Sequence, residues 1–308
     1  MALGLADDLL SSCCLYSSAP AMVAPAMNQA MWAHPAVKVN VATLAARGVR
    51  IVEPGTGHLA CGDEGKGRMS EPAVIAEEVG RFFALKDLWK GVRVMVTAGP
   101  TREPLDPVRV LTNHSSGRMG YALARAARDR GAEVTLVSGP VALASPTGVS
   151  IVPVRTALEM HREVMRSLPG CDLIVMAAAV ADYRPRTVSS SKIKKGSGGI
   201  TVRLEKNPDI LAEVLRRRGK GARVVGFAAE TEDLEKNAVE KWRRKPCDML
   251  VANRVGDPAD GFHGERHEVV VYCRGSKSPL RPPEDTKERL ADTLLDLMET
   301  RWKISDRR

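Results

Sequence analysis

Aromatic side chains are scarce in this sequence. Phenylalanine, tyrosine and tryptophan make up 4% of its 308 residues, although 44% of the residues are apolar. A chain of this length can form one large or two ordinary domains with a sizeable core, and the composition predicts that the core is mostly aliphatic. With few aromatic platforms and no basic stripe interleaved with them, nucleic-acid binding is the least favoured function despite the net charge of +9. We expect no nucleic-acid partner.

Long apolar runs and paired cysteines are also missing. The longest apolar run near the middle, Leu173–Ala181, lies between two aspartates and is too short to span a bilayer. Asp7 and Asp8 interrupt the only candidate signal segment at the amino terminus. The six cysteines form no C-x-x-C pair and no regular framework, which favours reduced thiols. We therefore expect a cytoplasmic protein with no membrane partner.

Charge is distributed unevenly along the chain. Residues 1–80 carry five Lys or Arg against eight Asp or Glu, a net charge of −3, which leaves +12 for residues 81–308. Such a surplus can attract polyanionic substrates. The alternative is that basic clusters are solvated helix faces, and for Arg216–Arg218 we favour that alternative.

Residues 91–308 alternate between strand and helix patterns. A β-branched run, Val92–Thr97, follows a glycine and ends at Ala98-Gly99-Pro100, which indicates a buried parallel strand. Further strands are predicted at 133–138, near 151, and at 173–177, 224–227 and 249–252, and helices at 118–130, 157–167, 209–217, 233–244 and 285–302. This alternation predicts an α/β fold, a doubly wound Rossmann-like parallel sheet with ligands at the carboxyl ends of the strands.

The loop after the first of these strands has the composition of an anion site. Residues 99–113 form a long connection with the donors Arg102, Arg109 and Asn113. Asn113–Gly117 then brings small residues and free N–H groups to the start of a helix, where an anion is favoured. We interpret it as a phosphate or carboxylate cradle. The alternative is that Ser115 and Ser116 only cap the helix.

Several ordered motifs in residues 91–308 closely resemble the phosphopantothenate–cysteine ligase half of the bifunctional coenzyme A biosynthesis family. The resemblance covers about three quarters of the chain. It implies that the carboxylate of 4'-phosphopantothenate attacks CTP in the presence of Mg²⁺, and that cysteine captures the resulting acyl cytidylate. The motifs, besides residues 91–131, are 177–184 (AAAVADYR), 192–195 (KIKK), 206–210 (KNPDI) and 226–231 (GFAAET).

The resemblance also implies roles for individual residues. Asn113 would hold the acyl cytidylate, Lys192 on a basic, glycine-rich flap would stabilise charge, and Arg109 would hold substrate together with Ala178 and Ala179. Nucleotide binding would fall to Ser115, Ser116, Gly117, Asp182, Lys192, Asn207, Pro208, Asp209, Ile210, Phe227, Lys241 and Lys245. Residue chemistry leaves simpler alternatives open: a turn or cap for Asp182, a cap for Asp209, core for Phe227 and solvated charges for the last two lysines. The metal ligands are unknown, and the family's ligase halves predict a homodimer.

Residues 1–80 resemble part of a different domain, the flavin-dependent phosphopantothenoylcysteine decarboxylase. By that resemblance Asn28 would hold the substrate carboxylate and Cys61 would be the acid that protonates the decarboxylated product. The family's first strand, active-site histidine and serine-rich flavin segment do not precede Met1. We therefore expect a partial, amino-terminally truncated flavoprotein-type domain in which FMN binding is doubtful and decarboxylation is not supported. Residues 81–90 would be a linker.

A second hypothesis is an NAD- or flavin-dependent oxidoreductase, since parallel α/β domains often bind dinucleotides. No G-x-G-x-x-G follows the strand at Val92, and the 99–113 loop is unlike the tight dinucleotide turn. We therefore rank the oxidoreductase below the ligase.

Overall fold

The computed structural model describes residues 1–58, 64–85, 87–195, 198–230, 234–254, 266–276 and 278–306. The chain divides into two compact units. Unit 1 comprises Met1–Leu88 with Ala144–Gly148, and unit 2 comprises Trp89–Leu143 with Val149–Arg308. None of the described helices is both long and apolar enough to cross a membrane.

Unit 1 is built from short elements. Helices α1 (Leu9–Tyr16), α2 (Gln29–Ala33), α3 (Pro35–Ala46) and α4 (Pro72–Leu85) accompany two small sheets. Strand β1 (Met22–Val23) pairs in parallel with β2 (Arg50–Ile51), and β3 (Gly55–His58) pairs antiparallel with β4 (Glu64–Arg68). Helix α4 begins earlier than the predicted linker and includes its first five residues, 81–85.

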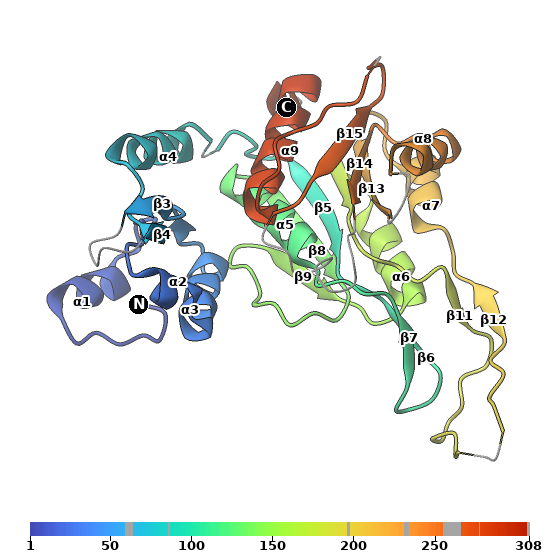
Figure 1. The fold of residues 1–308 in the computed structure, drawn as a ribbon. Coiled ribbons are helices and arrows are strands. Elements are labelled where there is room, and N and C mark those ends of the chain that lie inside the picture. The colour runs from blue at the N-terminus through green and yellow to red at the C-terminus, as the bar shows by residue number, and fades with distance from the viewer. Residues whose placement is uncertain are drawn as a thin grey trace. The chain divides into compact units, whose positions relative to one another are not determined.

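Unit 2 is an α/β unit around a seven-stranded, mainly parallel sheet (Figure 1). The strand order is β15-β14-β13-β10-β5-β8-β9, and only β15 runs antiparallel to its neighbour. The order reverses direction between β5 and β10, so the chain leaves the sheet on opposite sides there. In open α/β sheets such a reversal creates a crevice beyond the carboxyl ends of the strands. The bounds are β5 Arg93–Ala98, β8 Glu133–Ser138, β9 Ser150–Pro153, β10 Leu173–Met176, β13 Arg223–Glu230, β14 Met249–Arg254 and β15 Val269–Cys273.

Helices cover both faces of this sheet. Helices α5 (Arg118–Asp129) and α9 (Lys287–Trp302) pack together on one face, and α6 (Ala157–Ser167), α7 (Ile210–Arg217) and α8 (Leu234–Arg244) lie on the other (Figure 1). The short helix η1 (Ile304–Asp306) follows α9. The predicted helix starts at 209 and 285 lie one and two residues early, because capping residues were counted as helical, and the predicted start at 233 lies outside the described residues. Asp209 and Thr286, for example, cap α7 and α9 by accepting hydrogen bonds from Ala212 and Arg289.

The buried core of unit 2 is aliphatic, as the composition predicts. Strand β10 is buried along its whole length, as near-continuous apolar runs are in parallel sheets covered on both faces. The largest fully buried apolar side chains of the strands are Met95, Leu136, Leu173, Ile174, Met249 and Leu250.

Two antiparallel ribbons project from the carboxyl end of the sheet (Figure 1). Strand β6 (Arg102–Pro104) pairs with β7 (Val110–Thr112), and β11 (Tyr183–Pro185) pairs with β12 (Leu204–Lys206). We call β11, β12 and the described residues between them the arm. The sequence predicted a loop and a mobile flap at these places, not ribbons.

A buried arginine joins α5 to α9. Arg130 is fully buried and donates to the Ala126 carbonyl at 2.9 Å, to Asp292 Oδ1 at 2.8 Å and to Asp296 Oδ1 at 2.5 Å. Its guanidinium carbon lies 5.9 Å from the Trp89 ring centroid, and the Trp89 indole donates to Glu299 at 2.7 Å. The first residue of unit 2 and its last long helix are therefore held by one charged group.

Replacing Arg130 tests this joint. Arg130→Ala removes the buried cation and leaves two carboxylates without it, which we expect to cost about 3 kcal/mol and to lower the melting temperature of unit 2 by roughly 10 °C. Differential scanning calorimetry measures the shift. Arg289→Ala, an exposed arginine on α9, is the matched control and should change the melting temperature by less than about 2 °C. Equal shifts in both variants would contradict the role given to Arg130.

Candidate functional site

The site is organised by the junction where β5 and β10 end. Beyond the strands the chain continues to pair: the Ala179 N–H donates to the Gly99 carbonyl at 2.9 Å, and Pro100 and Ala179 form a parallel bridge. Two buried hydroxyls extend the pairing, since Thr97 Oγ1 accepts from Ala178 N at 3.1 Å and Thr101 Oγ1 accepts from Ala181 N at 3.0 Å. The alanines that follow β10 therefore lie against the backbone of the 99–101 turn.

Asn113 is tied to the same junction. Its Nδ2 donates to the carbonyl of Val180 at 3.1 Å and to that of Ala179 at 3.4 Å. Because Asn113 follows the ribbon β6–β7 and precedes α5, this contact holds the loop before α5 against the segment after β10. The sequence analysis grouped Asn113, Ala178 and Ala179 in one site, and they lie together.

The helix start that follows is not capped by a side chain. The N-cap of α5 is Gly117, with φ of 74°, and no side chain caps the helix there. Ser115 Oγ instead accepts from Gly117 N at 3.3 Å. The alternative that the two serines serve as helix caps is thus not realised. A Cβ at residue 117 would lie 2.7 Å from a methyl of Val141, so glycine is required by space as well as by conformation.

A cavity of about 480 Å³ opens at this helix start. It lies within unit 2, and its size is in the range of small-molecule sites. Sequence reasoning missed the wall supplied by residues 140–143, which follow β8 and have no charged or nucleophilic side chain to signal them. The lining residues are Pro100, Arg102, Thr112, Asn113, His114, Ser115, Ser116, Arg118, Pro140, Val141, Ala142 and Leu143.

A second set of predicted residues lies beyond β10 and β13. Asn207 Nδ2 donates to the Ala181 carbonyl at 2.8 Å, and its N–H donates to the Asp182 carbonyl at 2.8 Å. Arg184 donates to Asn207 Oδ1 at 3.0 Å, which orients the Asn207 amide. Pro208 and Asp209 follow at the start of α7, where Asp209 is the cap and Ile210 the first, buried helical residue. The cap alternative for Asp209 is therefore confirmed as its structural role.

Lys241 and Lys245 belong to this second set. Lys241 Nζ donates to the carbonyl of Phe227 at 3.0 Å, and Lys245 Nζ pairs with Asp209 Oδ2 at 2.6 Å. The simpler alternative, that both are solvated helix charges, is not what the structure has. Phe227 itself is partly buried, and Asp182 is exposed.

The arm carries Lys192, and a buried carboxylate anchors the segment around it. Asp106 is buried in the β6–β7 connection and accepts from the backbone N–H groups of Val108 and Arg109 at 2.8 Å each and of Ile193 at 3.1 Å. The Arg109 guanidinium donates to the Ile193 carbonyl at 3.2 Å. Lys192, next to this anchor, is exposed. Sequence analysis missed Asp106, although an aspartate before Pro107 in a tight connection is a signal for a turn.

Asp106 is arranged to stay ionised. Burial opposes ionisation, but hydrogen bonds from Val108, Ile193 and Arg109, together with the Arg109 charge, outweigh it and hold the pKa of the carboxyl below its ordinary value of 3.8. A depressed pKa in the folded state gives stability that is present above the unfolded value and is lost as the pH falls through the folded value. The anchor of the arm is therefore intact at neutral pH and weakens below about pH 4.

In unit 1, Asn28 lies against the β3–β4 hairpin. It caps α2 by accepting from Ala30 N at 2.8 Å, and the neighbouring Met27 N donates to the Gly67 carbonyl at 2.9 Å. A Cβ on Gly67 would lie 2.2 Å from the Met27 carbonyl oxygen, so the hairpin packs directly on this backbone. Cys61 falls outside the described residues.

Among the residues that the structure describes, no group of three or more His, Cys, Asp or Glu side chains is placed to hold a metal ion. The side chains that converge on the site are amides, hydroxyls and cations. Such groups bind and orient anions, and they stabilise charge that develops during transfer.

Two family profiles match the chain. The profile of the DNA/pantothenate metabolism flavoprotein C-terminal domain matches residues 89–301, and the Flavoprotein profile matches residues 1–84. The coenzyme A biosynthesis bifunctional protein CoaBC of Escherichia coli strain K12 is 46% identical over 312 residues, covering 100% of this chain and 76% of its own length. The chain belongs to this family. The Vibrio cholerae serotype O1 relative is 46% identical over 300 residues, covering 97% of this chain and 74% of its own.

Solved structures agree with the fold of unit 2. The crystal structure of the C-terminal domain of a coenzyme A biosynthesis bifunctional protein CoaBC is 36% identical, with a TM-score of 0.59, and covers 71% of this chain and 99% of that domain. A DNA/pantothenate metabolism flavoprotein from Streptococcus pneumoniae, 21% identical with a TM-score of 0.57, shares the fold.

The comparisons correct the interpretation of the amino-terminal segment. We expected residues 1–80 to be an amino-terminally truncated, partial decarboxylase domain, and that expectation is wrong. The Flavoprotein profile covers residues 1–84, and the E. coli relative aligns along the whole chain. The doubts about FMN and about the decarboxylase step rested on the same premise and fall with it.

The arm anchor gives a test. Asp106→Asn keeps the side-chain shape but turns one of the two accepting oxygens into a donor, so either Ile193 or the Val108–Arg109 pair loses its acceptor. We expect trypsin to cleave the arm at least about fivefold faster, as weaker local protection allows. Asp129→Asn, a carboxylate that bonds its neighbour Arg128 on α5, is the control and should leave the rate unchanged. An unchanged rate in Asp106→Asn would remove Asp106 as the anchor.

Proposed function

We propose that unit 2 ligates cysteine to 4'-phosphopantothenate with CTP, and that residues 1–84 belong to the decarboxylase that acts on the product. Membership of the CoaBC family supports both activities. The observation that carries the ligase assignment is the convergence of Asn113, the serine loop at the start of α5 and the backbone of Ala178–Asp182 at the point where the strand order reverses. The strand order also supports the finer description of unit 2 as doubly wound and Rossmann-like.

The proposed chemistry needs no nucleophile from the protein. A carboxylate oxygen of 4'-phosphopantothenate attacks the α-phosphorus of CTP, and the bond to the β-phosphate breaks with loss of pyrophosphate. The amine of cysteine then attacks the acyl carbon, releases CMP and loses its proton. Positioning and electrostatic stabilisation would supply the acceleration, which suits the amides and cations of this site. Mg²⁺ would arrive with the phosphates of CTP, since it is usually bound through substrate oxygens.

The roles of individual residues follow from their places. The Asn113 amide would exchange its bonds to the two carbonyls for bonds to the acyl cytidylate. Arg109 from the β6–β7 connection and Lys192 from the arm would bring positive charge to phosphate oxygens, with Ser115, Ser116 and Gly117 offering donors at the helix start. Asp182, Asn207–Ile210, Phe227, Lys241 and Lys245 would form the nucleotide side of the crevice, where Lys245 would release Asp209 to bind phosphate.

For residues 1–84 we propose FMN as the cofactor, which would supply the redox chemistry of the decarboxylase. The family match supports the flavin, whereas the described contacts fit the substrate side. The amide of Asn28 and the closely packed β3–β4 hairpin would hold the substrate carboxylate, and Cys61 would supply the proton to the product. The contacts identify no residue that would touch the flavin ring, so no step is assigned to it.

Substitutions in the crevice test the ligase. Lys192→Gln should lower kcat for pyrophosphate release about 100-fold or more, because a charge that acts in the transition state is lost. Asn113→Asp should lower it similarly, since a carboxylate would face the Val180 and Ala179 carbonyls. The assay measures pyrophosphate with 4'-phosphopantothenate, Mg²⁺ and either CTP or ATP, with and without cysteine.

Lys194→Gln, an equal charge change two residues away on the arm, is the matched control for Lys192→Gln and should retain kcat within about threefold. Release that does not require 4'-phosphopantothenate, or that is equal with ATP and CTP, would contradict the proposed substrate set.

We also propose a homodimer through the ribbons of unit 2. Exposed apolar side chains gather on them, which marks an interaction surface: Val108 62%, Leu111 37%, Tyr183 45%, Val188 49%, Ile200 56%, Val202 42% and Leu204 46% exposed. Leu204→Asp should convert a dimer to a monomer at micromolar concentration in sedimentation equilibrium. Leu158→Asp, equally exposed at 46% but on α6, should not. A monomeric wild type would rule the dimer out.

A further inference from the structure

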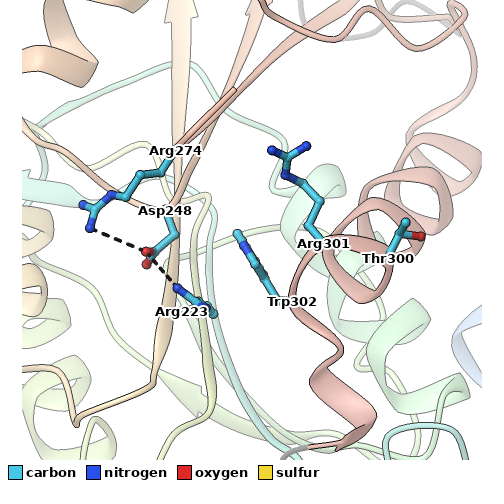
Figure 2. Close-up of a pocket in the computed structure, with 6 residues that line it drawn as sticks. All are labelled: Arg223, Asp248, Arg274, Thr300, Arg301 and Trp302. Atoms are coloured by element: carbon cyan, nitrogen blue, oxygen red, sulfur yellow. Dashed lines mark hydrogen bonds and ion pairs between the residues drawn. The ribbon is translucent and has the colours of Figure 1, made fainter. Parts of the chain in front are cut away.

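A second cavity of unit 2 lies at the opposite end of the strands from the crevice. It has a volume of about 480 Å³ and is lined by Arg223, Asp248, Arg274, Thr300, Arg301 and Trp302 (Figure 2). Arg223 begins β13 and Asp248 immediately precedes β14, so the cavity is at the amino ends of these parallel strands. The eight residues of β13 span about 23 Å, which separates this cavity from the end of the strand that reaches the crevice.

Positive charge exceeds negative charge around this cavity. Asp248 is almost fully buried and is satisfied: it accepts from Val224 N at 2.9 Å and from Arg218, and Arg223 and Arg274 lie at 3.5 and 3.9 Å from its Oδ1. Arg301 does not contribute to this cluster. It projects from the end of α9 (Figure 2) and donates to Ser276 Oγ. Three arginines, Arg218, Arg223 and Arg274, therefore share one carboxylate, and Arg301 adds a fourth positive charge at the cavity.

Some of the donors remain available. Nε of Arg223 is buried and has no hydrogen-bond partner among the described residues, although buried donors are normally paired. The side chains of Arg274 and Arg301 are accessible to a ligand. The Arg274 side chain is 51% exposed, and Arg301 is exposed as well. Guanidinium groups bind phosphate oxygens through forked pairs of N–H donors.

An aromatic wall completes the cavity. Trp302 follows Arg301 at the end of α9, and the Arg223 guanidinium carbon lies 5.6 Å from its ring centroid. Contact with the indole ring restricts the orientation of the Arg223 guanidinium. The ring also offers an apolar surface on which a planar group of a ligand can stack. This combination of cations, aromatic face and volume suits a small phosphorylated molecule.

We propose that this cavity is a binding site for a small phosphate-bearing molecule, separate from the ligase crevice and independent of the function proposed for it. Arg301 and Arg274 bind the phosphate oxygens, Arg223 adds its positive charge beside them, and Trp302 packs against any planar part of the ligand. Asp248 holds two of the arginines in place and does not touch the ligand.

Tryptophan fluorescence measures binding at this site directly. The intact protein is titrated with inorganic phosphate, pyrophosphate and ADP, and we expect a saturable change in emission that is absent in Trp302→Phe. Asn113→Asp and Lys192→Gln, which alter the crevice, should retain the change. ADP binding more tightly than pyrophosphate assigns the ring a share in recognition, and equal affinities assign recognition to the phosphates alone.

Substitutions of arginine decide whether the site is specific. Arg301→Gln should weaken binding about tenfold or more, as loss of a charge-assisted hydrogen bond does, and Arg301→Lys should recover part of that loss. Arg289→Gln, an exposed arginine about three turns away on the same helix, is the matched control and should bind as the wild type does. Circular dichroism checks that each variant is folded. The proposal is overturned if none of the three ligands gives a saturable change, or if Arg289→Gln weakens binding as much as Arg301→Gln.

Discussion

The pairing of two chain segments beyond the ends of β5 and β10 determines the geometry of the crevice. Two buried threonine hydroxyls and the Gly99 carbonyl accept the N–H groups of Ala178, Ala179 and Ala181 in the segment that follows β10. Both the loop to α5 and the segment leading to the arm start from this junction. Their relative position is therefore fixed by backbone hydrogen bonds, which tolerate little displacement. The flexible side chains of the site extend from a rigid base.

The sequence predicts best those parts of the fold whose signal is local. The strand β5 is recognisable because a β-branched run lies between glycines, and α5 because its apolar residues repeat with helical spacing. The ribbons β6–β7 and β11–β12 gave no comparable signal. Their strands have three residues each, and β11 pairs with a strand that begins more than fifteen residues later. The antiparallel strand β15 was missed although it has a local signal, since its five residues, VVVYC, are a β-branched run that is buried throughout.

The same distinction holds for the site. Composition identified Asn113–Gly117, because small residues before a helix have a direct physical meaning. It did not identify Asp106, whose role depends on Ile193 across 87 positions, or the 140–143 wall, whose side chains are ordinary. For Lys241 and Lys245 the general expectation of solvated charges was wrong, because the helix places one of them against a strand carbonyl and the other against the cap of α7. Contacts between distant segments decided each case.

The joint at Arg130 has a consequence for synthesis of the chain on the ribosome. Residues 89–130 supply one half of the joint, but its carboxylates lie on α9, about 160 positions later. During translation the buried arginine has no counter-charge until α9 leaves the exit tunnel, and the apolar face of α5 has no cover. Contacts this distant in sequence form late and slowly. Unit 2 therefore completes its folding only after nearly the whole chain has been made, and a nascent chain that stalls before α9 exposes the surface that chaperones bind.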